Sequence, residues 1–112
     1  MSQLLNPARL AIFSGNPALV QRLIRIYLDT SPKVLGDIEV SVASGDIEQV
    51  GSHAHSLKGL AAELGAEELA EFSHRLQMAA RAGDVAVIGS LVKDLVCCYK
   101  ETTVALQLLN TN

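Results

Sequence analysis

The sequence is poor in aromatic side chains, proline and cysteine. Among its 112 residues there is no tryptophan, and there are only two tyrosines, two phenylalanines, three prolines and two cysteines. Hydrophobic residues nevertheless make up 49% of the chain, so the core must be largely aliphatic, which suits helices packed side by side. A chain of this length has room for one hydrophobic core, and we expect residues 1–112 to form a single domain.

Positive charge is scarce as well. Nine Lys and Arg residues face twelve Asp and Glu residues, and the net charge of −3 with no basic cluster argues against a nucleic-acid-binding surface. No basic start precedes a long apolar run, so we expect no signal peptide. The most apolar window, residues 85–98, contains Lys93 and Asp94 and is not expected to span a membrane. The absence of a glycine-rich phosphate-binding run argues against a kinase with its own ATP site.

The two cysteines, Cys97 and Cys98, are adjacent within an expected helix. Neighbouring helical side chains diverge, so a disulfide between these two would distort the backbone. Two free thiols suit a reducing cytosol, and we expect a cytoplasmic protein. No second cysteine pair or partner histidine accompanies them, which disfavours a thiol-based active site.

Proline, glycine and capping residues divide the chain into helical segments. Asn-Pro pairs open two of them, Ser31 is expected to cap another after a break at residues 30–32, and glycines end several. The expected helices cover residues 6–13, 17–29, 31–44, 46–64, 66–82 and 84–109. Because the breaks are short, successive helices should be antiparallel neighbours. We therefore expect an all-α protein, an antiparallel up-and-down four-helix bundle with a short extra N-terminal helix.

Two of these helices show a clear apolar seam, with hydrophobic residues at alternating spacings of three and four. The seam of the helix over residues 46–64 comprises Ile47, Val50, Ala54, Leu57, Ala61 and Leu64. The seam expected for residues 66–82 comprises Leu69, Phe72, Leu76 and Ala79.

His55 lies beside the first seam rather than on it. At about 100° per residue, its flank of the helix also carries Gly51, Lys58, Gly59 and Ala62. Glycine inside a helix costs roughly 0.5–1 kcal/mol relative to alanine, so two glycines around one histidine indicate that something approaches the backbone closely there. A neutral imidazole is a nucleophile, and the Lys58 ammonium on the same face can meet an anion. Together these residues suggest phosphoryl acceptance from another protein.

The run His55-Ser56-Leu57-Lys58-Gly59, with Leu64-Gly65-Ala66 and Leu69 after it, resembles the motif of histidine-containing phosphotransfer (HPt) domains. The resemblance extends from about Asn6 to Leu109 in helix lengths and breaks. Leu60 departs mildly from the small residue that often follows the glycine.

The resemblance implies a carrier rather than an enzyme. In this family the histidine accepts a phosphoryl group from a receiver-domain aspartate and passes it to another receiver. Lys58 and Gly59 match the family's lysine and glycine, and Gln77 lies where the next helix presents Gln or Glu to the histidine. The implied partners are response-regulator receiver domains and a hybrid histidine kinase, with Mg²⁺ held by the partner, no cofactor in this chain and a monomeric state.

Two alternatives remain open at the level of sequence. A phosphoacceptor domain of a chemotaxis-type histidine kinase shares the His-x-x-Lys-Gly pattern but receives its phosphate from ATP through a separate catalytic domain. An adaptor bundle would bind receivers without transferring anything. The residues expected at the docking surface are Gly51, Gly59 and Ala62.

The remaining histidines are given structural interpretations. His53 points about 200° away from His55 and is expected to be a packed or rim residue. His74 falls nearly opposite the expected seam of its helix and is predicted to be plain surface. Since the three imidazoles do not converge, a metal site is disfavoured.

Overall fold

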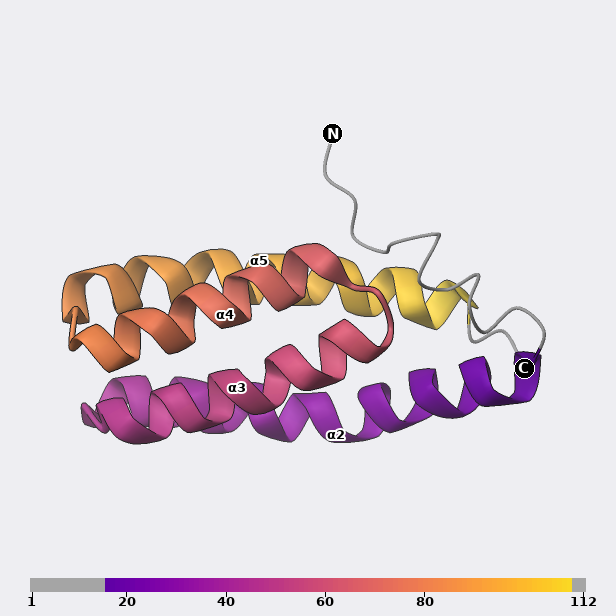
Figure 1. The fold of residues 1–112 in the computed structure, drawn as a ribbon, viewed down its shortest axis with the longest axis horizontal. Coiled ribbons are helices and arrows are strands. Elements are labelled where there is room, and N and C mark those ends of the chain that lie inside the picture. The colour runs from indigo at the N-terminus through magenta and orange to yellow at the C-terminus, as the bar shows by residue number, and fades with distance from the viewer. Residues whose placement is uncertain (1–15, 110–112) are drawn as a thin grey trace.

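The computed structural model describes residues 16–109, and within that range the chain forms four helices and no strand. The helices are α2 (Pro17–Ser44), α3 (Ile47–Glu63), α4 (Glu67–Ala82) and α5 (Val85–Leu109). They lie side by side along the long axis, with the α2–α3 and α4–α5 turns at one end, while α2 and α5 extend beyond the α3–α4 turn in the other direction (Figure 1). The short helix expected over residues 6–13 lies outside the described range.

The three turns share one construction, built on a glycine in the left-handed region. Gly45, Gly65 and Gly83 have φ values of 75°, 69° and 69°. Each glycine amide donates to the carbonyl three residues back, and the next amide donates to the carbonyl five residues back, the pattern of a Schellman motif. Asp46 and Asp84 then begin the following helices, because their carboxylates accept from the amides of Gln49 and Val87. The expected ends of these helices are thus confirmed.

The expected break at residues 30–32 is wrong, because α2 continues through Pro32 as one helix. Proline inside a helix removes a hydrogen bond and costs about 3 kcal/mol. Here Pro32 is exposed, while its neighbour Ser31 is fully buried with its hydroxyl 2.9 Å from the Tyr99 hydroxyl of α5. Tyr27, one turn earlier, places its hydroxyl 3.4 Å from Thr103 Oγ1. We attribute the continuity of α2 to these contacts with α5. Ser31 is therefore a buried link between helices and not a cap.

The core is largely aliphatic, as the composition predicts, although its largest buried side chain is Tyr27. Its aliphatic members include Ile24 and Ile38 of α2, Leu57 of α3, and Leu69 and Leu76 of α4, all 0% exposed. The α3 seam is confirmed, since Val50, Ala54, Leu57 and Ala61 are buried.

The buried stripe of α4 differs from the expected seam. Phe72 is only half-buried, whereas Ser73 is fully buried and Ala80 is buried with it. Ser73 can enter the core because its hydroxyl donates to the Leu69 carbonyl of its own helix at 2.8 Å. The buried stripe is consequently rotated towards Ser73 and Ala80, and this rotation brings the neighbouring positions of α4 to face α3.

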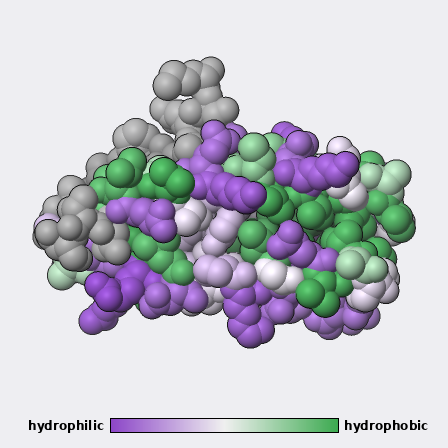
Figure 2. All heavy atoms as spheres, turned by 180° about the vertical axis from the view of Figure 1, so that it is seen from behind, coloured by the Kyte–Doolittle hydropathy of each residue, from purple (hydrophilic) through white to green (hydrophobic). Residues whose placement is uncertain are grey.

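The face of the molecule opposite to the one seen in Figure 1 is mostly a mixture of polar and apolar surface (Figure 2). Hydrophobic side chains gather towards the end that carries the α2–α3 and α4–α5 turns (Figure 2). Val40 and Val85, near those turns, are 68% and 66% exposed. Among the described helices, none combines the length and apolar character needed to cross a bilayer.

Candidate functional site

His55 is exposed and lies in a shallow groove between α3 and α4. We define this His55 groove by Gly51, Ser52 and Ser56 of α3 and by Gln77, Ala80 and Arg81 of α4. Two small residues of this groove, Gly51 and Ala80, face each other where the two helices meet. His55 therefore stands at the edge of a tightly packed helix pair, open to solvent on its outer side.

Gln77 lies beside the imidazole, as expected. Its side-chain Nε2 is 3.4 Å from His55 Nδ1, across the α3–α4 interface. An amide can donate to an imidazole nitrogen through its NH₂ group or accept from a ring N–H through its oxygen. Gln77 can therefore engage Nδ1 and leave Nε2, the outer ring nitrogen, free to react.

The two glycines on the His55 flank have different surroundings. A Cβ added at Gly51 would lie 3.4 Å from Ala80 Cβ, so this glycine faces the chain's own helix α4. A Cβ added at Gly59 would meet nothing within 4 Å, and Gly59 is exposed. The openness that sequence reasoning expected at both positions therefore exists at Gly59 only.

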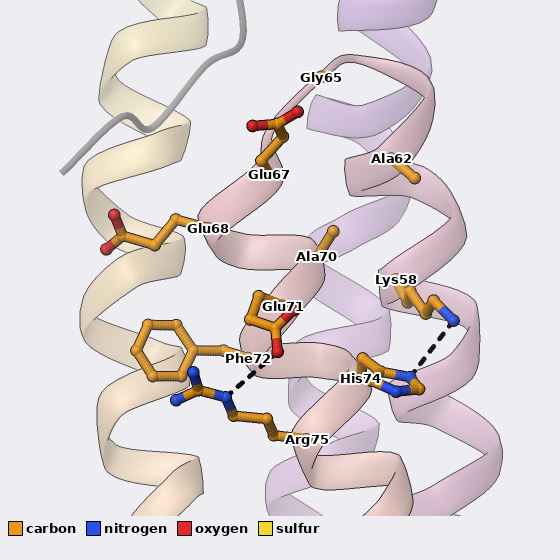
Figure 3. Close-up of a pocket in the computed structure, with 10 residues that line it drawn as sticks. All are labelled: Lys58, Ala62, Gly65, Glu67, Glu68, Ala70, Glu71, Phe72, His74 and Arg75. Atoms are coloured by element: carbon orange, nitrogen blue, oxygen red, sulfur yellow. Dashed lines mark hydrogen bonds and ion pairs between the residues drawn. The ribbon is translucent and has the colours of Figure 1, made fainter.

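Lys58 lies in a second groove, one turn further along α3. Its Nζ is 3.3 Å from His74 Nδ1 of α4, and Figure 3 shows the two side chains meeting between the helices. Ala62, the last of the residues expected to contact a partner, is half-buried and also lines this groove. Lys58 does not line the His55 groove, although both residues belong to one flank of α3.

The interpretation of His74 as plain surface is wrong. His74 is half-buried and faces α3, because the buried stripe of α4 is centred closer to Ser73 than the seam that includes Phe72. If Ser73 and Ala80 are taken as inner positions, the helical geometry of α4 predicts that His74 points towards Lys58. The missing signal was therefore a buried serine, which hydrophobic periodicity does not register.

His53 is half-buried on the other side of α3, which confirms it as a rim residue. It faces α2, where the Lys33 ammonium lies 2.9 Å from the Asp37 carboxylate. This ammonium lowers the pKa of Asp37, and His53 has a smaller effect in the same direction. In the described part of the chain, no three His, Cys, Asp or Glu side chains are grouped so that they could hold a metal ion.

The cysteines are both free, as expected, and differ in environment. Cys97 is exposed, whereas Cys98 is buried. Burial raises the pKa of the Cys98 thiol to about 11. Neither thiol lines the His55 groove.

Comparison with known proteins agrees with the motif. The family model of the Hpt domain matches residues 22–110. The fold matches the crystal structure of histidine-containing phosphotransfer protein B (HptB) from Pseudomonas aeruginosa PAO1 with a TM-score of 0.90, at 20% sequence identity over 98% of this chain and 96% of that one. At that identity the likeness establishes a shared fold. No curated protein shows significant sequence similarity to this chain. Because the family match spans most of the sequence, this chain belongs to the Hpt domain family, and its function is phosphoryl relay through a histidine.

Proposed function

We propose that His55 is the phosphoacceptor, and that it receives its phosphoryl group from the phospho-aspartate of a receiver domain and passes it to a second receiver. The single observation behind this assignment is the exposed imidazole of His55, placed at a groove with Nδ1 beside Gln77. Neither His53 nor His74 offers the same combination, since both are half-buried. The proposal takes residues 1–112 as one domain, an antiparallel up-and-down bundle with a short N-terminal helix.

The chemistry requires a neutral imidazole with its proton on Nδ1. In that tautomer the lone pair of Nε2 forms the nitrogen–phosphorus bond while the bond from phosphorus to the aspartyl oxygen breaks and its electron pair returns to the carboxylate. A half-turn of the Gln77 amide exchanges the positions of its nitrogen and its oxygen. The amide oxygen of Gln77 then lies beside His55 Nδ1 and accepts a hydrogen bond from the N–H of the ring. Gln77 would then hold the reactive tautomer, and the reverse reaction passes the phosphoryl group to the next aspartate.

The charge that builds up on the phosphoryl oxygens needs stabilisation from both proteins. We assign Mg²⁺ to the partner receiver and the Lys58 ammonium to this chain, with no cofactor of its own. Gly59, open to solvent, provides the surface against which the receiver's loops pack. We take the donor to be the receiver of a hybrid histidine kinase and the carrier to be a monomer in the cytoplasm, where the two free thiols would stay reduced.

The test is phosphoryl transfer from isolated phosphorylated receivers to this chain, with the modified residue located by mass spectrometry at mildly alkaline pH. We expect His55 alone to be modified, His55→Gln to abolish transfer, and His53→Gln, the matched control on the same helix, to transfer normally. Modification at His53 or His74 would refute the assignment. Labelling that arrives only from an ATP-bound kinase domain would favour the chemotaxis-type alternative, and normal receiver binding without transfer would favour an adaptor.

A further inference from the structure

We infer that His74 is a positioning residue for phosphoryl transfer, because it holds the Lys58 ammonium on the flank of α3 that also carries His55, without neutralising its charge. The inference rests on the proposed function, since it concerns the cation that meets the phosphoryl group. The motif explains Lys58 but assigns nothing to His74.

The residues of the two helices that meet here have matched spacings. His55 and Lys58 are three residues apart on α3, and Gln77 and His74 are three residues apart on α4. The side chains meet as two cross-helix pairs, His55 with Gln77 at 3.4 Å and Lys58 with His74 at 3.3 Å. Residues three apart lie one above the other on a helix, so each α4 side chain supports the α3 residue opposite it. Gln77 supports the nucleophile and His74 supports the cation.

In the Lys58–His74 pair, the lysine supplies the donor and the histidine supplies the acceptor. A lysine ammonium has three N–H donors and no acceptor, so His74 Nδ1 must be unprotonated and its proton must lie on Nε2. Lysine is a long and flexible side chain, and the contact removes part of that freedom before any phosphoryl group arrives. Two N–H groups of the ammonium are left to bind phosphoryl oxygens. The tether therefore orders Lys58 and leaves it able to act.

The partner of the Lys58 ammonium in this contact is an imidazole and not a carboxylate. A neutral imidazole holds the ammonium without cancelling its charge, whereas a carboxylate would neutralise it. Carboxylates are close by, but Glu71 is paired with Arg75 at 3.3 Å, and Arg75 in turn lies over the Phe72 ring. In Figure 3, Glu68, Phe72 and Arg75 extend towards α5, whereas Lys58 and His74 meet on the α3 side. Protonation of His74 would remove the acceptor and place a second positive charge against Lys58.

The experiment is a double-mutant cycle read by phosphoryl transfer. His74→Leu removes the acceptor, His74→Gln keeps one in the form of an amide oxygen, and each is made with Lys58 and with Lys58→Met. Transfer from a phosphorylated receiver and the lifetime of phosphohistidine are measured on every protein, alongside thermal unfolding. With Lys58 present we expect His74→Leu to slow transfer three- to tenfold and His74→Gln to restore most of the rate. With Lys58→Met we expect both substitutions to change the rate by less than twofold.

A purely structural role for His74 gives a different pattern. The losses would then be the same with Lys58 and with Lys58→Met, they would follow the melting temperature, and the positioning role would be overturned. The tautomer of His74, read from its ring ¹⁵N chemical shifts, is a second readout that needs no phosphorylation, and Lys58→Met should redistribute its proton between the two nitrogens. Failure of the unmutated protein to accept phosphate at His55 would instead refute the proposed function.

Discussion

The two sides of the α3 flank around His55 look alike in sequence and differ in the fold. One turn before His55, Gly51 faces α4, and an added Cβ would touch Ala80 at 3.4 Å. One turn after it, Gly59 faces open space, with nothing within 4 Å of an added Cβ. Gly51 lets two helices of this chain approach each other, whereas Gly59 leaves room outside the chain. A glycine beside a reactive residue can therefore serve packing or docking, and only its neighbours decide which.

The largest effect that would test this comparison is expected at Gly51. Gly51→Leu should destabilise the fold by about 1–3 kcal/mol, because the added atoms beyond Cβ must separate α3 from α4. Gly51→Ala is the matched control, since its Cβ makes an ordinary contact with Ala80, and it should hold or slightly raise the stability. Urea or thermal unfolding of the two variants measures the difference. Equal stability of Gly51→Leu and the wild type would mean that the groove is wide enough to accept a large side chain.

The next effect is expected at Gly59 and has the opposite sign for stability. Gly59→Gln should raise the free energy of unfolding by roughly 0.5 kcal/mol through helix propensity, because nothing obstructs the new side chain. The same side chain should obstruct a docking receiver and slow receiver-driven transfer about tenfold, equivalent to about 1.4 kcal/mol. Phosphoramidate, a small donor that needs no docking, should still modify His55.

Gly89 provides the control for Gly59. It is exposed in α5, outside the His55 groove, and an added Cβ there also meets nothing within 4 Å. Gly89→Gln should therefore gain stability similarly without affecting transfer. If Gly59→Gln transferred as fast as Gly89→Gln, Gly59 would not belong to the docking surface.

A smaller effect is expected at Gln77, which lines the His55 groove together with Gly51. Gln77→Leu removes one hydrogen bond to His55 Nδ1, and a bond of this kind contributes about 1 kcal/mol, so transfer should slow about fivefold. Gln77→Glu keeps an acceptor for the ring N–H and should retain most of the rate. The two variants are compared by the rate of receiver-driven transfer. A wild-type rate for Gln77→Leu would show that Gln77 does not hold the tautomer of His55.

The smallest effect should come from the cysteines, which lie away from both glycines. Iodoacetamide at pH 8 should modify the exposed Cys97 and spare Cys98, because burial raises the pKa of Cys98 from 9.0 to about 11. A thiol whose pKa is raised by folding stabilises the fold fully at any pH below its ordinary pKa of 9.0. That contribution to the free energy of unfolding is lost as the pH rises through about 11. Alkylation at Cys97, checked by mass spectrometry, should leave transfer unchanged. Rapid alkylation of Cys98 would show that this part of α5 opens readily.

Sequence reasoning succeeded where a local signal decides the structure. The Gly-Asp pairs at 45–46 and 83–84 predicted helix ends because both residues act through their own backbone and first neighbours. It failed where a contact between residues distant in sequence overrides the local signal. Pro32 indicates a break, but the neighbouring Ser31 makes a buried contact with Tyr99, which is 68 residues away in the sequence. The same limit applies at the site: the motif indicates His55 and Lys58, but the partner of Lys58 depends on how α4 is rotated, and a buried serine sets that rotation.

The glycine-closed turns described above bear on how the phosphoryl group moves between partners. Each turn is only two or three residues long, and its amides are engaged in hydrogen bonds. The helices therefore cannot move far relative to one another, and α3 cannot carry His55 from one partner to another. We therefore expect the described bundle to behave as a rigid shuttle, with little backbone change between free and bound forms. Under the proposed function, the donor and the acceptor receiver must therefore dock at the same exposed His55 one after the other.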